Sequence, residues 1–295
     1  MKTPIFTGSC TAMVTPYTES KINYECLFSL IDFQAENGTD AILISGTTGE
    51  NATQSFEERC MLFESAAKYN RGRMKLIAGI GANNTEIAYQ YAKTAESCGY
   101  DGVLMVTPYY NKTTQTGLIK HFTYVADRIN VPMILYNVPS RTGIGIEAET
   151  YKILSEHPMI NGTKEASGNF TLFSNTKYLC DDNLNIWSGN DDNTVPMMAL
   201  GAKGVISVAS NIIPKDISEL CKLCFSNDFT QAETIHMKFA ELFSVLFIET
   251  NPIPVKTAMK LMGWDVGDFR LPLIDMSLKN KEKLKTSLMK LGLIS

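Results

Sequence analysis

A single lysine, Lys164, stands inside a short apolar stretch, INGTKEAS (160–167), that is typical of a buried β-strand. It is the only lysine within any of eight such stretches. An ammonium group removed from water is costly unless it finds an anion or gives up its proton. The neighbouring Glu165 is a poor partner, because successive residues of a strand point to opposite faces. We therefore expect a neutral amine in a dry pocket, which is a nucleophile for carbonyl carbon and can form a Schiff base.

Hydroxyl groups at the ends of other apolar stretches could move the protons that Schiff-base chemistry requires. Tyr136, Tyr110 and Thr48 have hydroxyls that both donate and accept hydrogen bonds. A tyrosine at a strand end is often simple packing, but Tyr136 comes from the stretch directly before that of Lys164. We therefore assign these three hydroxyls to the candidate site.

Two further features could hold an anionic substrate. The turn SGTTGEN (45–51) offers two hydroxyls and exposed backbone N–H groups before a helix, which suits a carboxylate. The alternative for this turn is an ordinary strand-to-helix connection with a helix cap. Arg141 offers a planar fork for a second carboxylate, with a surface salt bridge as its alternative.

Other reactive residue types are assigned structural roles. Asp191 and Asp192 follow a strand pattern and are expected to cap the helix that comes next. Cys221 and Cys224 form a C-x-x-C that has no second pair and no histidine at ligand spacing, so two thiols on one helix face are favoured. GIGANN (79–84) lacks the third glycine of a dinucleotide fingerprint. We expect no metal site and no cofactor.

The elements that must position these residues alternate regularly along the chain. Segments with helical periodicity lie between the apolar stretches, so strand and helix repeat every 20 to 35 residues. Eight such units predict an α/β fold, a (β/α)8 TIM barrel, with a doubly wound open sheet as the main competitor. The predicted strands are 10–16, 41–46, 76–81, 102–108, 133–139, 160–167, 185–190 and 204–210.

The remainder of the chain carries only helical signals. We predict a catalytic barrel over residues 1–227 and a C-terminal helical extension over residues 228–295, whose apolar stripes must pack on the barrel or on another subunit. No role beyond packing is predicted for the extension.

Composition narrows the possible partners. The net charge of −4, without a basic stripe, argues against nucleic acid and against an anionic membrane surface, so a small-molecule substrate is favoured. The N-terminus is broken by Pro4 and Gly8 before an apolar core could form, which argues against a signal peptide. The seven scattered cysteines suit reduced thiols better than disulfides. We expect a cytoplasmic protein.

With these residues assembled, the whole sequence resembles the dihydrodipicolinate synthase family of pyruvate-dependent class I aldolases, to which N-acetylneuraminate lyase is related. The resemblance implies a (β/α)8 barrel that condenses pyruvate with L-aspartate 4-semialdehyde to 4-hydroxy-tetrahydrodipicolinate, on the diaminopimelate route to lysine. The motifs that carry it are GTTGE (46–50), VTPYYN (106–111), YNVPSRTG (136–143), TKEASG (163–168), SGNDD (188–192) and GVISV (204–208).

The resemblance also implies roles for individual residues. Lys164 would form the imine with pyruvate, and Thr48, Tyr110 and Tyr136 would relay protons. Arg141 would receive the carboxylate of the semialdehyde. Tyr110 would reach into the site of a neighbouring subunit, which implies a homotetramer built as a dimer of dimers.

The pyruvate pocket is implied in the same way. Thr47 and Thr48 would hold the pyruvate carboxylate, and Gly189 and the backbone of Ile206 would line the pocket. Arg141, together with Tyr110, the second tyrosine of PYYN, favours the synthase over the alternative of a sialic acid or 2-keto-3-deoxy-sugar-acid lyase. A second alternative, a catalytically dead barrel that senses a ligand, would be expected to lose Lys164 or a relay hydroxyl, and none is missing.

Regulation by lysine is where the sequence departs from the family. Ala52, Asn83 and Tyr109 match positions of the inhibitory site, whereas its remaining positions hold a different set of residues. Those residues are Phe56, Arg59 and Ile87. Because an isoleucine cannot pair with an ammonium group and an arginine repels it, we expect lysine to inhibit weakly or not at all.

Overall fold

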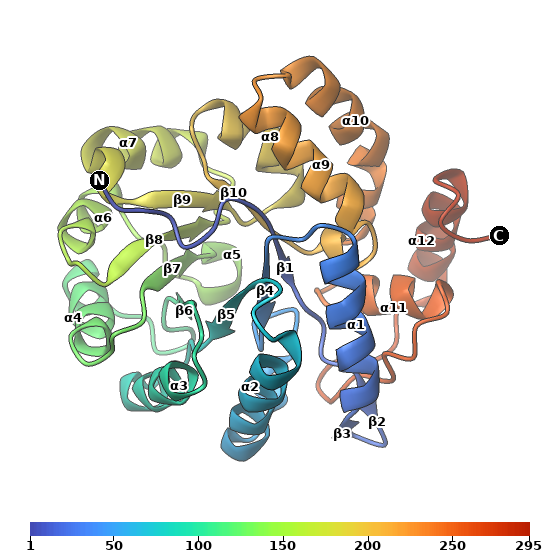
Figure 1. The fold of residues 1–295 in the computed structure, drawn as a ribbon, viewed down its shortest axis with the longest axis horizontal. Helices are drawn as coiled ribbons and strands as arrows, with labels where there is room; N and C mark the ends of the chain where they lie inside the picture. The colour runs from blue at the N-terminus through green and yellow to red at the C-terminus, as the bar shows by residue number, and fades with distance from the viewer.

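The computed structural model describes residues 1–295 and shows a closed barrel of eight parallel strands with helices around it (Figure 1). Around the barrel the strands follow the order β1-β10-β9-β8-β7-β6-β5-β4. The predicted fold class is confirmed. The barrel strands are β1 Gly8–Ala12, β4 Ala41–Ile44, β5 Lys75–Gly79, β6 Gly102–Val106, β7 Met133–Asn137, β8 Ile160–Glu165, β9 Asn185–Ser188 and β10 Gly204–Ser207.

Each predicted strand corresponds to one observed strand, but each prediction continues past the observed end. The difference has a physical reason, since the last residues of every apolar stretch already turn into the loop that carries polar groups to the mouth of the barrel. A small hairpin of β2 Tyr17–Thr18 and β3 Lys21–Ile22 was not predicted, because two-residue strands leave no periodicity to detect.

Helices follow the strands and cover the outside of the barrel. Their first turns are capped as the sequence allows: Ser55 and Glu58 form a capping box on α2, and Asn84 caps α3. The helices of the barrel are α1 Tyr24–Glu36, α2 Phe56–Asn70, α3 Thr85–Ser97, α4 Gln115–Ala126, the short α5 Pro139–Thr142, α6 Ala148–Ser155, α7 Phe170–Cys180, α8 Thr194–Ala199 and α9 Pro214–Phe225.

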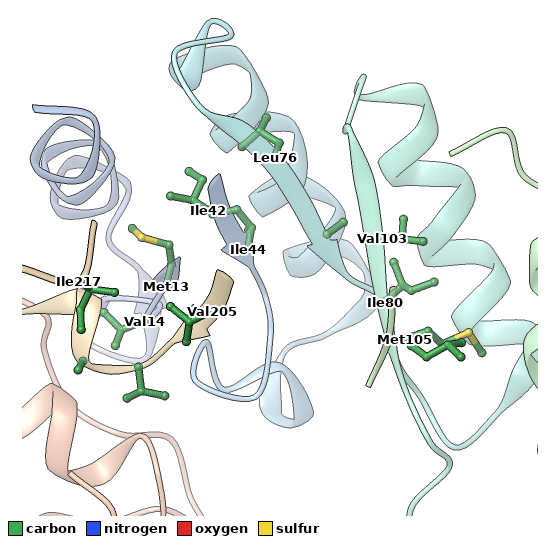
Figure 2. Packing of buried hydrophobic residues seen from close by; sticks show 14 of the residues in the cluster. Met13, Val14, Ile42, Ile44, Leu76, Ile80, Val103, Met105, Val205 and Ile217 are labelled. Atoms are coloured by element: carbon green, nitrogen blue, oxygen red, sulfur yellow. The ribbon is translucent and has the colours of Figure 1, made fainter. Parts of the chain in front are cut away.

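Strand residues alternate between two apolar cores. Outward side chains pack against the helices, as Figure 2 shows for Ile42, Ile44, Leu76, Val103 and Met105. Inward side chains form a second cluster that fills the barrel, and burial of each large apolar side chain contributes roughly 1.5–3 kcal/mol. The inward cluster includes Ala12, Leu43, Ile77, Leu104, Ile134, Tyr136, Trp187 and Ile206.

The C-terminal extension consists of α10 Phe229–Val245, α11 Ile253–Leu261 and α12 Leu278–Lys290. Helix α10 packs on α8 and α9, and α11 packs on the short turn Ala209–Asn211 that follows β10. The extension therefore packs on the barrel along one side (Figure 1). The division at residues 227 and 228 falls between α9 and α10, and the assignment of two separate units stays a prediction.

Candidate active site

A cavity of about 520 Å³ opens at the carboxyl-terminal mouth of the barrel. It collects six of the predicted site residues from four different strand ends: Thr47, Thr48, Tyr136, Arg141, Lys164 and Gly189. The opposite wall comes from the C-terminal extension. We call residues 247–251, between α10 and α11, the wall segment.

Lys164 lies on β8 with its side chain inside the barrel and 4% of its surface exposed. Its register partner on β7 is Tyr136, and the Nζ atom lies 4.6 Å from the centre of that tyrosine ring. None of the ion pairs of the chain includes Lys164. The lysine therefore faces the cavity beside an aromatic ring and without a carboxylate partner.

Glu165 points away from Lys164, as the alternation of strand side chains predicted. Its carboxylate accepts hydrogen bonds from Asn137 Nδ2 at 2.9 Å, from the Tyr151 hydroxyl at 3.1 Å and from the backbone N–H of Ser167 at 2.7 Å. These contacts lie between the barrel and its helices. The expectation that the two residues would not pair is confirmed.

The turn between β4 and α2 presents unused hydrogen-bond donors to the cavity. The backbone N–H groups of Gly49 and Glu50 donate inside the turn, to Gly46 O and Thr47 O at 3.1 Å each. The N–H groups of Thr47 and Thr48 have no acceptor within the protein. Two free backbone donors beside two threonine hydroxyls suit a carboxylate.

Thr48 is buried, and its Oγ1 atom accepts a hydrogen bond from Asn251 Nδ2 at 3.0 Å. Because this oxygen accepts from the amide, its own hydroxyl proton is free to be donated elsewhere. Asn251 belongs to the wall segment, so the extension holds a hydroxyl of the barrel that the sequence analysis predicted to relay protons.

Gly189 follows β9 and leaves room for the lysine side chain. A Cβ atom at this position would lie 2.6 Å from Ala166 Cβ and 3.1 Å from Lys164 Cε. Only glycine fits at this position without pushing on its neighbours.

Arg141 lies on α5 at the rim of the cavity, where its guanidinium is exposed and its Nη2 atom is 3.5 Å from Asn251 O. An exposed guanidinium at a cavity rim can bind a carboxylate that enters from solvent.

Two predicted site residues do not line the cavity. Tyr110 points into solvent with 93% of its surface exposed and has a left-handed backbone with φ 72°. The side chain of Ile206 is buried in the inward cluster together with Tyr136, and the role of its backbone in the pocket stays a prediction.

The acidic residues after β9 do not act as predicted. Asp191 is buried and accepts hydrogen bonds from the backbone N–H groups of Val208 and Ala209 at 3.1 and 3.0 Å. It therefore caps the turn after β10, and neither aspartate caps the helix that follows, α8. Burial raises the pKa of Asp191, while these hydrogen bonds act in the opposite direction. The helix-capping prediction was wrong, because the carboxylate of Asp191 accepts from N–H groups that follow another strand, β10, and α8 has no side-chain cap.

The positions that the family resemblance links to lysine lie on α2, on α3, in the turns before these helices and, for Tyr109, in the loop between β6 and α4. Arg59 is buried, donates from Nη2 to Gly79 O and stacks over the Tyr91 ring at 4.0 Å. Phe56 stacks on the same ring, at 5.0 Å between centroids. Ala52, Asn83 and Tyr109 are all partly or largely exposed.

The sequence analysis did not predict that the wall segment lines the cavity. Phe247, Ile248, Glu249, Thr250 and Asn251 all line the cavity. The only local signal was the polar break ETNP between two apolar helical patterns.

The remaining sequence expectations concern thiols, metals and membranes. All seven cysteines are free thiols. No three or more His, Cys, Asp or Glu side chains are gathered in a way that could hold a metal ion. None of the helices combines the length and the apolar character required to cross a membrane.

A buried lysine without a carboxylate partner, set beside a tyrosine at the mouth of a (β/α)8 barrel, defines a class I aldolase. Comparison with known proteins identifies the family within this class. The chain belongs to the dihydrodipicolinate synthetase family, which it matches over residues 5–291.

Similar proteins cover nearly the full chain. The 4-hydroxy-tetrahydrodipicolinate synthase of Sulfurihydrogenibium sp. is 49% identical over 98% of this chain and 100% of its own length. The crystal structure of dihydrodipicolinate synthase from Aquifex aeolicus has a TM-score of 0.96 and 47% identity, covering 98% of this chain and 99% of its own. A structure described as a monomeric dihydrodipicolinate synthase variant has a TM-score of 0.95 and 40% identity, covering 98% of each chain.

Proposed function

We propose that this protein is a 4-hydroxy-tetrahydrodipicolinate synthase that condenses pyruvate with L-aspartate 4-semialdehyde. The observation that carries the proposal is Lys164, which faces the cavity beside Tyr136 without an ionic partner. Family membership and relatives of this name over nearly the whole chain support it.

Pyruvate is proposed to bind with its carboxylate on the free N–H groups of Thr47 and Thr48. Its C2 carbonyl carbon then faces Lys164 Nζ. Attack by the amine forms a carbinolamine, and loss of water gives the imine. The positive imine nitrogen acidifies the methyl protons at C3, and removal of one proton produces the enamine.

Proton transfers in these steps are assigned to Tyr136 and Thr48, which lie in the same cavity. The enamine carbon attacks the aldehyde carbon of the second substrate, whose carboxylate is held by Arg141 at the rim. The substrate amine then displaces Lys164 at C2, which closes the ring and frees the enzyme. One water is released overall.

Tyr110 is proposed to act in a neighbouring subunit, since it lies outside the cavity of its own chain and is 93% exposed. The proposal includes a homotetramer built as a dimer of dimers. Mixing the inactive variants Lys164→Ala and Tyr110→Ala under subunit exchange would restore part of the activity if a site takes Tyr110 from its partner. Mixtures that stay inactive would refute the shared site.

The test of the main proposal is borohydride reduction in the presence of pyruvate, followed by peptide mass mapping, with semialdehyde turnover measured on the same preparation. An adduct confined to Lys164, its absence in Lys164→Arg, and turnover of the semialdehyde are expected. An adduct without turnover would favour the alternative of a sugar-acid aldolase, in which pyruvate condenses with a sugar aldehyde, and no adduct would remove the imine mechanism. A cytoplasmic location is part of the proposal, supported by the seven free thiols.

A further inference from the structure

A buried ion pair joins the catalytic barrel to the C-terminal extension. Lys256 Nζ on α11 lies 2.7 Å from Glu50 Oε1, and both side chains are 0% exposed. In every other ion pair of the chain at least one side chain remains partly exposed to solvent. Neither residue lines the cavity, so neither touches a substrate bound there.

The presence of a buried ion pair is not explained by a gain in folding stability. Removing two charges from water is expensive, and apolar residues of similar volume often give an equally stable or more stable protein. The remaining hydrogen-bonding capacity of this pair is well used: Lys256 Nζ also donates to Asp268 O at 2.8 Å, and Glu50 Oε2 accepts from the backbone N–H of Arg270 at 3.2 Å. The ammonium group also lies between two rings, 4.9 Å from the Tyr17 centre and 5.0 Å from the Phe269 centre.

Glu50 connects the ion pair to the active-site turn through the backbone. Glu50 closes the turn that carries Thr47 and Thr48, and its backbone N–H donates to Thr47 O. Its backbone is left-handed, with φ 57° and ψ 37°, a conformation that a non-glycine residue adopts only when its surroundings hold it.

The extension therefore contacts the 47–50 turn through two side chains. Lys256 holds the carboxylate of Glu50 at one end, and Asn251 holds the hydroxyl of Thr48 at the other. Asn251 and Lys256 are close neighbours along the chain, and the first turn of α11 lies between them.

We infer that Glu50 and Lys256 are positioning residues for the reaction, whose ion pair fixes the 47–50 turn so that Thr48 and the free N–H groups meet the substrate in the reactive geometry. This inference rests on the proposed Schiff-base synthase function. Misplacement of catalytic groups by about 1 Å can cost on the order of 100-fold in rate.

The test uses the double variant Glu50→Gln/Lys256→Met, which removes both charges and leaves no charge unpaired. Activity is measured well below the melting temperature of each variant. We expect a melting temperature near that of the wild type, a fall in kcat of about 10- to 100-fold, and slower exchange of the C3 protons of pyruvate with D₂O. The adduct trapped by borohydride at saturating pyruvate should remain on Lys164.

A matched control lies one turn further along the same helix. Lys260 pairs with Asp268, whose side chain is 92% exposed, so Lys260→Met should retain kcat within about twofold. Glu50→Gln alone serves if the double variant does not fold, since it preserves shape and keeps one oxygen acceptor for Lys256.

The outcomes separate this inference from the proposed function. If the folded double variant, or the folded Glu50→Gln variant, keeps kcat, KM for pyruvate and proton exchange within about twofold of the wild type, the positioning role is overturned. A wild-type protein that forms no adduct with pyruvate would instead overturn the proposed function.

Discussion

Replacing Gly189 with alanine should disturb the reactive lysine directly. The new Cβ would lie 2.6 Å from Ala166 Cβ, whereas ordinary contacts begin at 3.4 Å, so one of the two must move by about 0.8 Å. A second close contact, 3.1 Å to Lys164 Cε, pushes the lysine away from the β9 side of the cavity. Backbone Glu165 O, also at 3.1 Å, limits relaxation in the remaining direction.

The expected magnitude follows from these distances. Overpacking of this kind costs about 1–3 kcal/mol in the free energy of unfolding, which lowers Tm by about 2 °C for each kcal/mol in a chain of this size. Because an error of about 1 Å in a reacting group costs on the order of 100-fold, a shift of a few tenths of an ångström should lower kcat/KM for pyruvate about 10-fold.

Thermal unfolding and steady-state kinetics, with borohydride trapping at a series of pyruvate concentrations, measure both effects. Gly145→Ala is the matched control, because its Cβ would meet only ordinary contacts, the nearest being Asn137 Oδ1 at 3.6 Å. If Gly189→Ala kept the wild-type Tm and pyruvate kinetics, the reasoning from close packing around Lys164 would be wrong.

Four further outcomes are expected. Tyr136→Phe should lower kcat by about 100- to 1,000-fold with an unchanged circular dichroism spectrum, and a smaller loss would argue against proton transfer by its hydroxyl. Burial lowers the pKa of His121 to about 4, so the unfolded chain binds more protons than the folded chain below pH 6.5. The free energy of unfolding should therefore be at its full value above pH 6.5 and fall by about 3 kcal/mol toward pH 4. Urea titrations should find a smaller fall in His121→Gln. Lys2 Nζ donates to three carbonyl groups at and beyond the end of α6, so Lys2→Met should lower unfolding free energy by about 2 kcal/mol and leave kcat unchanged. Millimolar lysine should inhibit weakly in a kinetic titration, because Arg59 and Ile87 stand where the family resemblance implies that the ammonium would need an anion. Strong inhibition would contradict this.

Local sequence patterns were sufficient to predict the barrel and the strand face on which Lys164 lies. Apolar stretches of strand length, separated by helical periodicity, predict the alternating order, and the alternation of strand side chains places Lys164 and Glu165 on opposite faces. The cavity then follows, because the carboxyl ends of barrel strands meet at one mouth.

Contacts between segments far apart in the chain could not be predicted from local sequence patterns. Asn251 and Thr48 are 203 residues apart, and no periodicity links them. The capping of the turn after β10 by Asp191 was missed for the same reason, since the acceptor and its donors come from different loops.

The wall segment also sets an order of events during synthesis. All eight strands leave the ribosome before residues 247–251 do, so the barrel can begin to fold while its cavity still lacks one side. A chain that stops after β10 contains Lys164 and Tyr136 but has neither the amide that holds Thr48 nor the ammonium that holds Glu50. Incomplete or clipped chains should therefore be much less active than the full chain, and the 47–50 turn is held in place only in a chain translated beyond Lys256 on α11.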